Sequence, residues 1–309
     1  MHNLCNHRAK LCPAHGTPEI GRTRSVMPGI FTITPYARRH RRDTLSLLAH
    51  NHRVHSHLDW HETDQWLNSD GVHLRLGWQD ERLVGLLGAS RPVGMTSWMR
   101  LVAAQNGLDF APLFNILWDD VSRVLKLQDV QTVLVLIIDD WIARYLSALG
   151  FHSVETVITL RRDGGRLPVP TSGPVALRVA TRDDLEQIAQ VDAAAFASAW
   201  QISLPDIRSA ERIAYSVTVA HIDSTLVGYQ LTTLYRASAH LARLAVIPEA
   251  QGQGVGSVLL DDLIRRFSRR GIQTMTVNTQ ASNLQSQRLY RRFGFQRTGY
   301  DLPVWAIDL

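Results

Sequence analysis

A glycine-rich stretch near residue 254 has the residue types needed to bind a phosphate-bearing ligand. It lies between an apolar extended segment and an apolar helical pattern, and it reads Gln251-Gly252-Gln253-Gly254-Val255-Gly256. Glycines permit positive φ angles and close approach, so several backbone N–H groups can point at one anion beside a helix N-terminus. The arrangement predicts a diphosphate site. Its glycine spacing differs from the Rossmann fingerprint, and the Gly-Lys-Ser/Thr of a Walker loop is missing.

A second set of polar residues lies on the last helical segment of the chain. Tyr290 is seven residues beyond Asn283, a rotation of about 700° on a helix, so both lie on nearly the same face. Ser282 and Gln285 have the spacing of a capping box and predict where this helix begins. Asn283 and Tyr290 can therefore address one ligand, and core packing is the alternative role for Tyr290.

Three residues near the glycine stretch are candidates for moving a proton. His240 precedes the strand that leads into the stretch, His221 ends an earlier strand, and Glu249 lies beside the stretch itself. A nucleophile that must lose a proton needs such a group or a water chain. Each residue has an ordinary surface position as its alternative role.

Strands and helices that would position these residues are predicted in the second half of the chain. Thr181, followed by Asp183 and Asp184, has the pattern of a helix N-terminus and predicts a helix to about Phe196. Alternating apolar residues predict strands, and apolar residues at three- and four-residue steps predict another helix. The predicted strands cover residues 177–180, 213–221, 225–233, 240–246, 273–277, 295–300 and 304–308, and this helix covers 255–267. The last two strands are expected to close the sheet of this half.

Both motifs resemble those of the Gcn5-related N-acetyltransferase (GNAT) family. Its pyrophosphate loop, Q/R-x-x-G-x-G/A, is matched by Gln251, Gly254 and Gly256. Its second signature, N-x-x-A-x-x-L-Y-x-x-x-G-F, is matched by Asn283, Leu289, Tyr290, Gly294 and Phe295, with Ser286 in place of alanine. The resemblance covers residues 175–309.

The resemblance implies an α/β (α+β) fold, a mixed and mostly antiparallel twisted sheet flanked by helices, and acetyl-coenzyme A as acyl donor without a metal. Tyr290 would protonate the departing thiolate, with His240 and Glu249 as candidate bases. Asn283 would contact the pantetheine arm, and a backbone N–H near Val246 would polarise the thioester carbonyl. The implied coenzyme-binding residues are Leu244, Ala245, Val246, Gln251, Gly252, Gln253, Gly254, Val255, Gly256, Ser257, Asn283, Ser286 and Tyr290.

The chain also matches itself at a shift of 143 to 144 positions, which indicates a duplication. Leu83-Val84-Gly85 falls on Leu226-Val227-Gly228, and Gly150-Phe151 falls on Gly294-Phe295. We therefore predict a disordered tail over residues 1–28, a degenerate GNAT-like domain over 29–163, a linker over 164–174 and a coenzyme-binding domain over 175–309. This tandem arrangement is similar to that of mycothiol synthase, from which we carry over no acceptor.

The first half lacks the residues that would bind the coenzyme. At the repeat shift, the loop reads Leu108-Asp109-Phe110-Ala111-Pro112-Leu113, and the asparagine and tyrosine become Asp139 and Leu146. We predict no acetyl transfer there. His57 and His61 have the spacing of metal ligands on a helix, but the nearby Trp60 and Trp66 favour packing on the other half or on a substrate.

Composition narrows the class of protein. Hydrophobic residues make up 45% and charged residues 20%, and the net charge of +5 is spread over arginine pairs, so we expect neither disorder nor a nucleic-acid partner. No apolar run approaches membrane-helix length. Cys5 and Cys12 are the only cysteines, which favours the cytoplasm. A zinc site among the tail cysteines and histidines lacks the usual close cysteine spacing.

These features predict an N-acetyltransferase that transfers an acetyl group to a primary amine of a small molecule or of a protein N-terminus. Catalysis is expected in the C-terminal half. The alternatives are a non-catalytic acyl-coenzyme A sensor or scaffold, and an enzyme for another acyl donor. A homodimer is left open.

Overall fold

The computed structural model describes residues 31–166, 168 and 174–309. The predicted tail over residues 1–28 and most of the predicted linker lie outside these ranges, as do both cysteines. Within the described ranges, no helix is long and apolar enough to cross a membrane.

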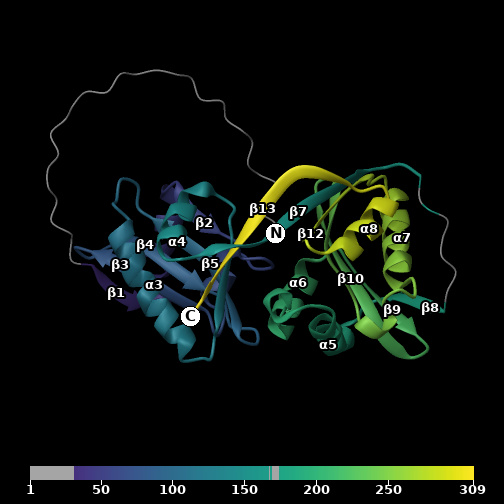
Figure 1. Cartoon of the computed structure of the whole chain (residues 1–309), viewed down its shortest axis with the longest axis horizontal. Coiled ribbons are helices and arrows are strands. Elements are labelled where there is room, and N and C mark those ends of the chain that lie inside the picture. Colours follow the sequence, from purple (N-terminus) through teal and green to yellow (C-terminus); the bar gives the residue numbers. More distant parts are fainter. Residues whose placement is uncertain (1–30, 167, 169–173) are drawn as a thin grey trace, which may run out of the picture.

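Two lobes make up the molecule, one from each half of the sequence (Figure 1). The N-terminal half contains β1 (Thr32–Pro35), α1 (Arg41–His50), β2 (Arg53–Ser56), α2 (Thr63–Leu67), β3 (His73–Gln79), β4 (Arg82–Ala89), β5 (Thr96–Ala104), α3 (Ala111–Lys126), β6 (Thr132–Leu136), α4 (Ala143–Ala148) and β7 (His152–Asp163). The C-terminal half contains β8 (Val175–Val179), α5 (Leu185–Ala195), α6 (Leu204–Ile213), β9 (Ser216–Ile222), β10 (Thr225–Tyr235), β11 (Ser238–Val246), α7 (Val255–Ser268), β12 (Thr274–Gln280), α8 (Leu284–Arg292) and β13 (Gln296–Asp308).

One 13-stranded sheet runs through both lobes, in the order β1-β3-β4-β5-β6-β13-β7-β12-β11-β10-β9-β8, with β2 paired to β5. Among the described strands, only β5 with β6 and β11 with β12 pair in parallel. This sheet and its flanking helices confirm the predicted fold class.

The last strand of each half lies between strands of the other half. β7 pairs with β12 along its second part, and β13 pairs with β6 from Val304 to Asp308. Figure 1 shows both strands running between the lobes. The prediction that residues 295–300 and 304–308 close the sheet of their own half is wrong in this respect. They form one strand, irregular between Arg297 and Asp301, whose end completes the N-terminal half.

Helices cover both faces of the sheet, and successive side chains along each strand point to opposite faces. In the N-terminal half, Leu86 faces the cluster that contains Leu47 of α1, whereas Leu87 faces the cluster of α3. In the C-terminal half, Tyr229 and Leu231 lie in the cluster of α5 and α6. Helix α7 packs on the opposite face of β10 and β11.

Local sequence explains where several elements begin and turn. Asp80 and Glu81, with φ of 47° and 63°, form the two-residue turn between β3 and β4 that the strand twist favours. Thr181 and Asp184 form a capping box ahead of α5, which confirms the predicted helix start, and the C-cap is Phe196 as predicted.

Candidate functional site

A cleft opens in the sheet between β11 and β12. The two strands pair only from Ser238 with Thr274 to Leu241 with Val277. Beyond that point β11 stays paired with β10 on its other edge, and β12 stays paired with β7. Among the described strands, the edge of β11 over residues 242–246 therefore has no partner on the side of β12. Backbone groups on this edge are available to a ligand.

The glycine stretch leads from the end of this edge into α7. Gly254 is the N-cap of α7 with φ of 88°, and Gly252 has φ of 77°, angles that favour glycine. The N–H groups of Ser257 and Val258 donate to the Gly254 carbonyl at 2.9 and 3.0 Å. The preceding N–H groups of Val255 and Gly256 have no acceptor within the helix and lie at its positive end. The N-terminus of α7 can therefore accept an anion.

A cavity of about 880 Å³ lies between this edge, the glycine stretch and α8. We call it the coenzyme groove, after the ligand that the sequence motifs predict for it. It is lined by Leu244, Ala245, Val246, Gln251, Gly252, Gln253, Gly254, Val255, Gly256, Ser257, Asn283 and Ser286. The fold thus brings together all the predicted coenzyme-binding residues except Tyr290.

Two arginines that were not predicted also line the groove. Arg288 and Arg292 are one turn apart on α8, and Arg292 donates a hydrogen bond to the hydroxyl of Ser257 on α7. Their guanidinium groups add positive charge beside the N-terminus of α7, which suits phosphate groups. The signal in the sequence was their spacing of four, which places both on one face of the helix.

Asn283 caps α8 rather than lying within its first turn. Its side-chain oxygen accepts the N–H of Ser286 at 3.0 Å, so the helix begins at Leu284. The predicted capping box at Ser282 is therefore wrong, because the Ser282 hydroxyl donates instead to Glu155 on β7. Since the side-chain oxygen of Asn283 is engaged, its NH₂ group is the one left to contact a ligand.

Tyr290 lies deeper than the groove. Its side chain is 4% exposed, packs against Phe295 at 5.6 Å between ring centroids, and does not line the groove. Burial raises the pKa of Tyr290, and Arg243 opposes this effect. The phenol therefore stays protonated at neutral pH. Its role as proton donor stays a prediction.

The candidate bases lie outside the groove lining. His240 is half-buried, and its Nδ1 is 2.8 Å from the hydroxyl of Thr276 on β12. Glu249 is exposed, and its backbone carbonyl accepts a hydrogen bond from Gln253. His221 lies on β9, paired opposite Leu226 and Ala176. The fold does not gather these three side chains at one point.

The C-terminal half of the chain is similar in sequence to known proteins. The model of the acetyltransferase (GNAT) family matches residues 185–295. A mycothiol acetyltransferase of Brachybacterium faecium is 27% identical over 183 residues, which cover 53% of this chain and 55% of that protein. A putative [ribosomal protein bS18]-alanine N-acetyltransferase of Bacillus subtilis is 24% identical over 124 residues, covering 40% of this chain and 82% of that protein.

The tandem arrangement has a counterpart among solved structures. A tandem GNAT protein from the clavulanic acid biosynthesis pathway superposes with a TM-score of 0.59 at 15% identity, covering 90% of this chain and 98% of that one. Residues 185–295 of the chain thus form a domain of the GNAT family of acyltransferases. It spans about half the length of the Brachybacterium relative, and the structural likeness concerns the fold.

A buried ion pair braces the edge of the groove in this tandem GNAT chain. Asp192 of α5 is fully buried, and its carboxylate accepts hydrogen bonds from Arg243 at 2.7 and 2.8 Å and from the Tyr229 hydroxyl at 2.6 Å. Arg243 also donates to the Trp200 carbonyl and lies 3.6 Å from the centre of the Phe196 ring. The pair therefore fixes the loop between α5 and α6 beside β11. Nothing in the local sequence pattern joined these residues.

Aromatic side chains fill the N-terminal half at the positions where the C-terminal half has its glycine loop. Phe110 and Phe114 are fully buried and pack with Trp141 and Tyr145, and the ring centroids of Phe110 and Tyr145 are 5.5 Å apart. Pro112 occupies the first turn of α3 and cannot donate an N–H. The N-cap of α3 is Phe110, where that of α7 is Gly254.

The histidines considered as metal ligands have other partners. Nδ1 of His57 is 2.8 Å from Arg100, and Nε2 of His61 is 2.9 Å from Asp206 of the other half. Trp60 packs into the hydrophobic cluster of α5 and α6. This contact supports the predicted packing of the segment on the C-terminal half.

Proposed function

We propose that the protein is an acetyl-coenzyme A-dependent N-acetyltransferase whose C-terminal half binds the coenzyme and carries out the transfer. The observation that carries this proposal is the groove itself. It combines an unpaired strand edge, the open N-terminus of α7 and two arginines in one cavity of about 880 Å³. The pyrophosphate would lie at Val255 and Gly256, and the pantetheine arm would lie along residues 244–246 and Asn283.

The chemistry is a direct attack by a neutral amine on the thioester, which supplies the acetyl group. A backbone N–H of the β11 edge near Val246 would donate to the carbonyl oxygen as negative charge develops. Tyr290, kept protonated by its raised pKa, would give a proton to the thiolate. We retain His240 and Glu249 as candidates for accepting the amine proton, acting through water because neither lines the groove.

The acceptor is a primary amine of a small molecule or of a protein N-terminus. The names of the relatives support both, since one is a mycothiol acetyltransferase and another a putative [ribosomal protein bS18]-alanine N-acetyltransferase. The second candidate function is a non-catalytic acyl-coenzyme A sensor or scaffold. Two observations favour it: Tyr290 is buried, and the candidate bases His240 and Glu249 do not line the groove.

Calorimetric titration of acetyl-coenzyme A into the protein tests the groove. We expect about one equivalent to bind, and Gly254→Asp to weaken binding at least tenfold, because a carboxylate would face the pyrophosphate. Gly271→Asp is the matched control: Gly271 follows the other end of α7, with φ of 80° and nothing within 4 Å of an added Cβ. Equal binding by both variants, or no binding to the unaltered protein, would overturn the proposed site.

A further inference from the structure

A second cavity, of about 470 Å³, lies between the two halves. We call it the interdomain cavity. One wall comes from the N-terminal half, from the segment around α2, the loop between β4 and β5, and β5 itself, and the other comes from residues 198–212. It shares no lining residue with the coenzyme groove. Its volume is within the range of small-molecule sites.

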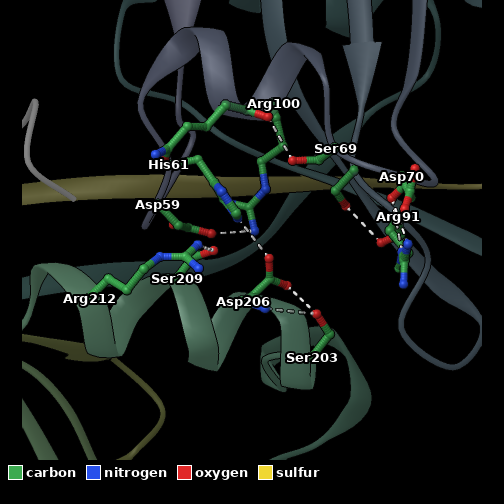
Figure 2. Close-up of polar contacts among 12 residues, drawn as sticks. Asp59, His61, Ser69, Asp70, Arg91, Arg100, Ser203, Asp206, Ser209 and Arg212 are labelled. Atoms are coloured by element: carbon green, nitrogen blue, oxygen red, sulfur yellow. Dashed lines mark hydrogen bonds and ion pairs between the residues drawn. The ribbon is translucent and has the colours of Figure 1, made fainter.

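Two carboxylates at the centre of the interdomain cavity already have cationic or hydrogen-bonding partners. Asp59 lies 2.6 Å from Arg100 and 2.9 Å from His57. Asp206 of α6 lies 2.9 Å from His61 and accepts the hydroxyl of Ser203 at 2.6 Å. Figure 2 shows Arg100, His61 and Asp206 facing one another across the boundary of the halves. Both carboxylates are therefore already engaged by side chains of the protein.

Burial opposes ionisation of both carboxylates, but their partners lower both pKa values. Arg100 and His57 hold the pKa of Asp59 below its usual range, and His61 and Ser203 do the same for Asp206. Both carboxylates are thus ionised at neutral pH and engaged. Asp59 also adopts a left-handed backbone angle, with φ of 50°, a conformation that is retained only where the surroundings fix it.

Of three other arginines around the cavity, Arg91 and Arg212 have no ion pair in the described part of the chain, and Arg208 has only a long one. Arg91 donates to the backbone carbonyl of Asp70, and Arg212 donates to the hydroxyl of Ser209. Arg208 is 3.8 Å from Glu186, and both side chains are more than half exposed. Of the lining carboxylates only that of Asp70 lacks an ion pair among the described residues. The lining groups without an ion pair in the described ranges are therefore two arginines, Arg91 and Arg212, and one carboxylate, Asp70, so their net charge is positive.

These arginines come from both halves. Figure 2 shows Arg91 on one side of the Arg100, His61 and Asp206 cluster and Arg212 of α6 on the other. Several serine hydroxyls and the indoles of Trp66 and Trp98 complete the walls. Guanidinium groups bind carboxylate and phosphate in preference to neutral polar groups.

We propose that the interdomain cavity is a binding site for a small organic anion, a carboxylate or a phosphate ester, to which Arg91 and Arg212 of opposite halves supply the unmatched positive charge. The site is distinct from the coenzyme groove. The loop between α5 and α6 separates them, because Phe196 lines the groove whereas Ser198 lines the cavity.

Calorimetry with glutarate and with glycerol 2-phosphate tests this proposal, with glutaramide and glycerol as the uncharged counterparts. We expect at least one anion to bind and neither uncharged compound to do so, and the stronger of the two anions identifies carboxylate or phosphate as the ligand chemistry. Arg212→Met and Arg91→Met should each weaken binding about tenfold. Arg269→Met, which removes an exposed arginine beyond the end of α7, should not.

Asp206→Asn provides a test of opposite sign. Removing this negative charge should leave anion binding unchanged or tighten it, whereas a site for a cation would lose its ligand. The proposal is overturned if no anion binds at millimolar concentration, if the uncharged compounds bind equally, or if Arg212→Met matches Arg269→Met. Acetyl-coenzyme A titration of each variant separates this result from the proposed function, because the two cavities share no residue.

Discussion

Tyr290 combines a position in the hydrophobic core with an expected part in chemistry. A phenol whose pKa is raised by burial is a weaker acid than usual. It holds its proton through the neutral range, so it can donate a hydrogen bond to the departing thiolate as the carbon–sulfur bond breaks. The same burial would be expected of a tyrosine that serves packing alone. The two roles differ in their effect on turnover.

Tyr290→Phe should separate an enzyme from a sensor. We expect kcat for acetylation of an amine panel to fall about 100-fold, the range for losing a general acid, with acetyl-coenzyme A affinity unchanged. Tyr300→Phe, which alters an exposed tyrosine of β13, is the control. Full activity of Tyr290→Phe would assign Tyr290 to packing. Coenzyme binding without turnover by the unaltered protein would favour the sensor.

His55 is a buried histidine with no hydrogen-bond partner for either ring nitrogen in the described part of the chain. Burial lowers its pKa to about 3, and His57 and Arg100 act in the same direction. In the unfolded chain the pKa is about 6.5. Between about pH 6.5 and about pH 3 the unfolded state therefore binds more protons at His55 than the folded state does. The contribution of His55 to the free energy of unfolding is highest above about pH 6.5, where His55 is neutral in both states, and it decreases as the pH falls.

His55→Leu should reduce the dependence of stability on pH. From pH 7.5 to 4.5 we expect the free energy of unfolding of the unaltered protein to lose roughly 2–3 kcal/mol through His55 alone. Urea unfolding of His55→Leu at these two pH values should show a difference smaller by that amount. His52→Leu, at an exposed position, should behave like the unaltered protein. An identical pH dependence in all three proteins would contradict this explanation.

Residues of the groove could be predicted where one short segment contains its whole signal. The turn angles at Gly252 and Gly254 and the helix after them follow from adjacent residues, so the loop was located correctly. Asp192 and Arg243 could not be paired in this way, because they are brought together only when α5 packs on β11. The same limit applies to Arg91 and Arg212, which belong to different halves.

At the scale of single elements, the end of β13 has the largest structural role for its length. Val304 is fully buried and Ala306 is 5% exposed, and Trp305 and Ile307 pack against the core of the N-terminal half. The backbone of this segment pairs with β6 on one side and with β7 on the other. Its alternating side chains thus contribute to hydrophobic clusters on both faces of the sheet.

A chain that ends at Pro303 should therefore lose the fold of its N-terminal half. Removing the buried side chains beyond this point would cost at least about 5 kcal/mol, which is comparable to the whole stability of many domains. Urea unfolding followed by tryptophan fluorescence should show an early transition that the full chain lacks. Adding a synthetic peptide of residues 300–309 should remove this early transition. An unchanged midpoint in the shortened chain would disprove the role assigned to β13.

At the scale of the molecule, the sequence was sufficient to predict the duplication but not the exchange of strands between the halves. Matching pairs such as Gly150-Phe151 and Gly294-Phe295 locate corresponding strands. An apolar alternation states which face of a strand is buried, but it does not name the neighbouring strand. Each last strand was therefore assigned to its own half. The boundaries at 163 and 175 stay predictions, since each half also contributes a strand to the other.

The exchanged strands also set an order of events during synthesis. β6 leaves the ribosome long before its partner at residues 304–308 is synthesised. At roughly 5–20 residues per second, the edge of β6 waits on the order of ten seconds for that partner. Until then it presents unpaired backbone groups, which favour association with other chains. A nascent chain of this protein therefore remains incompletely folded until residues 304–308 emerge.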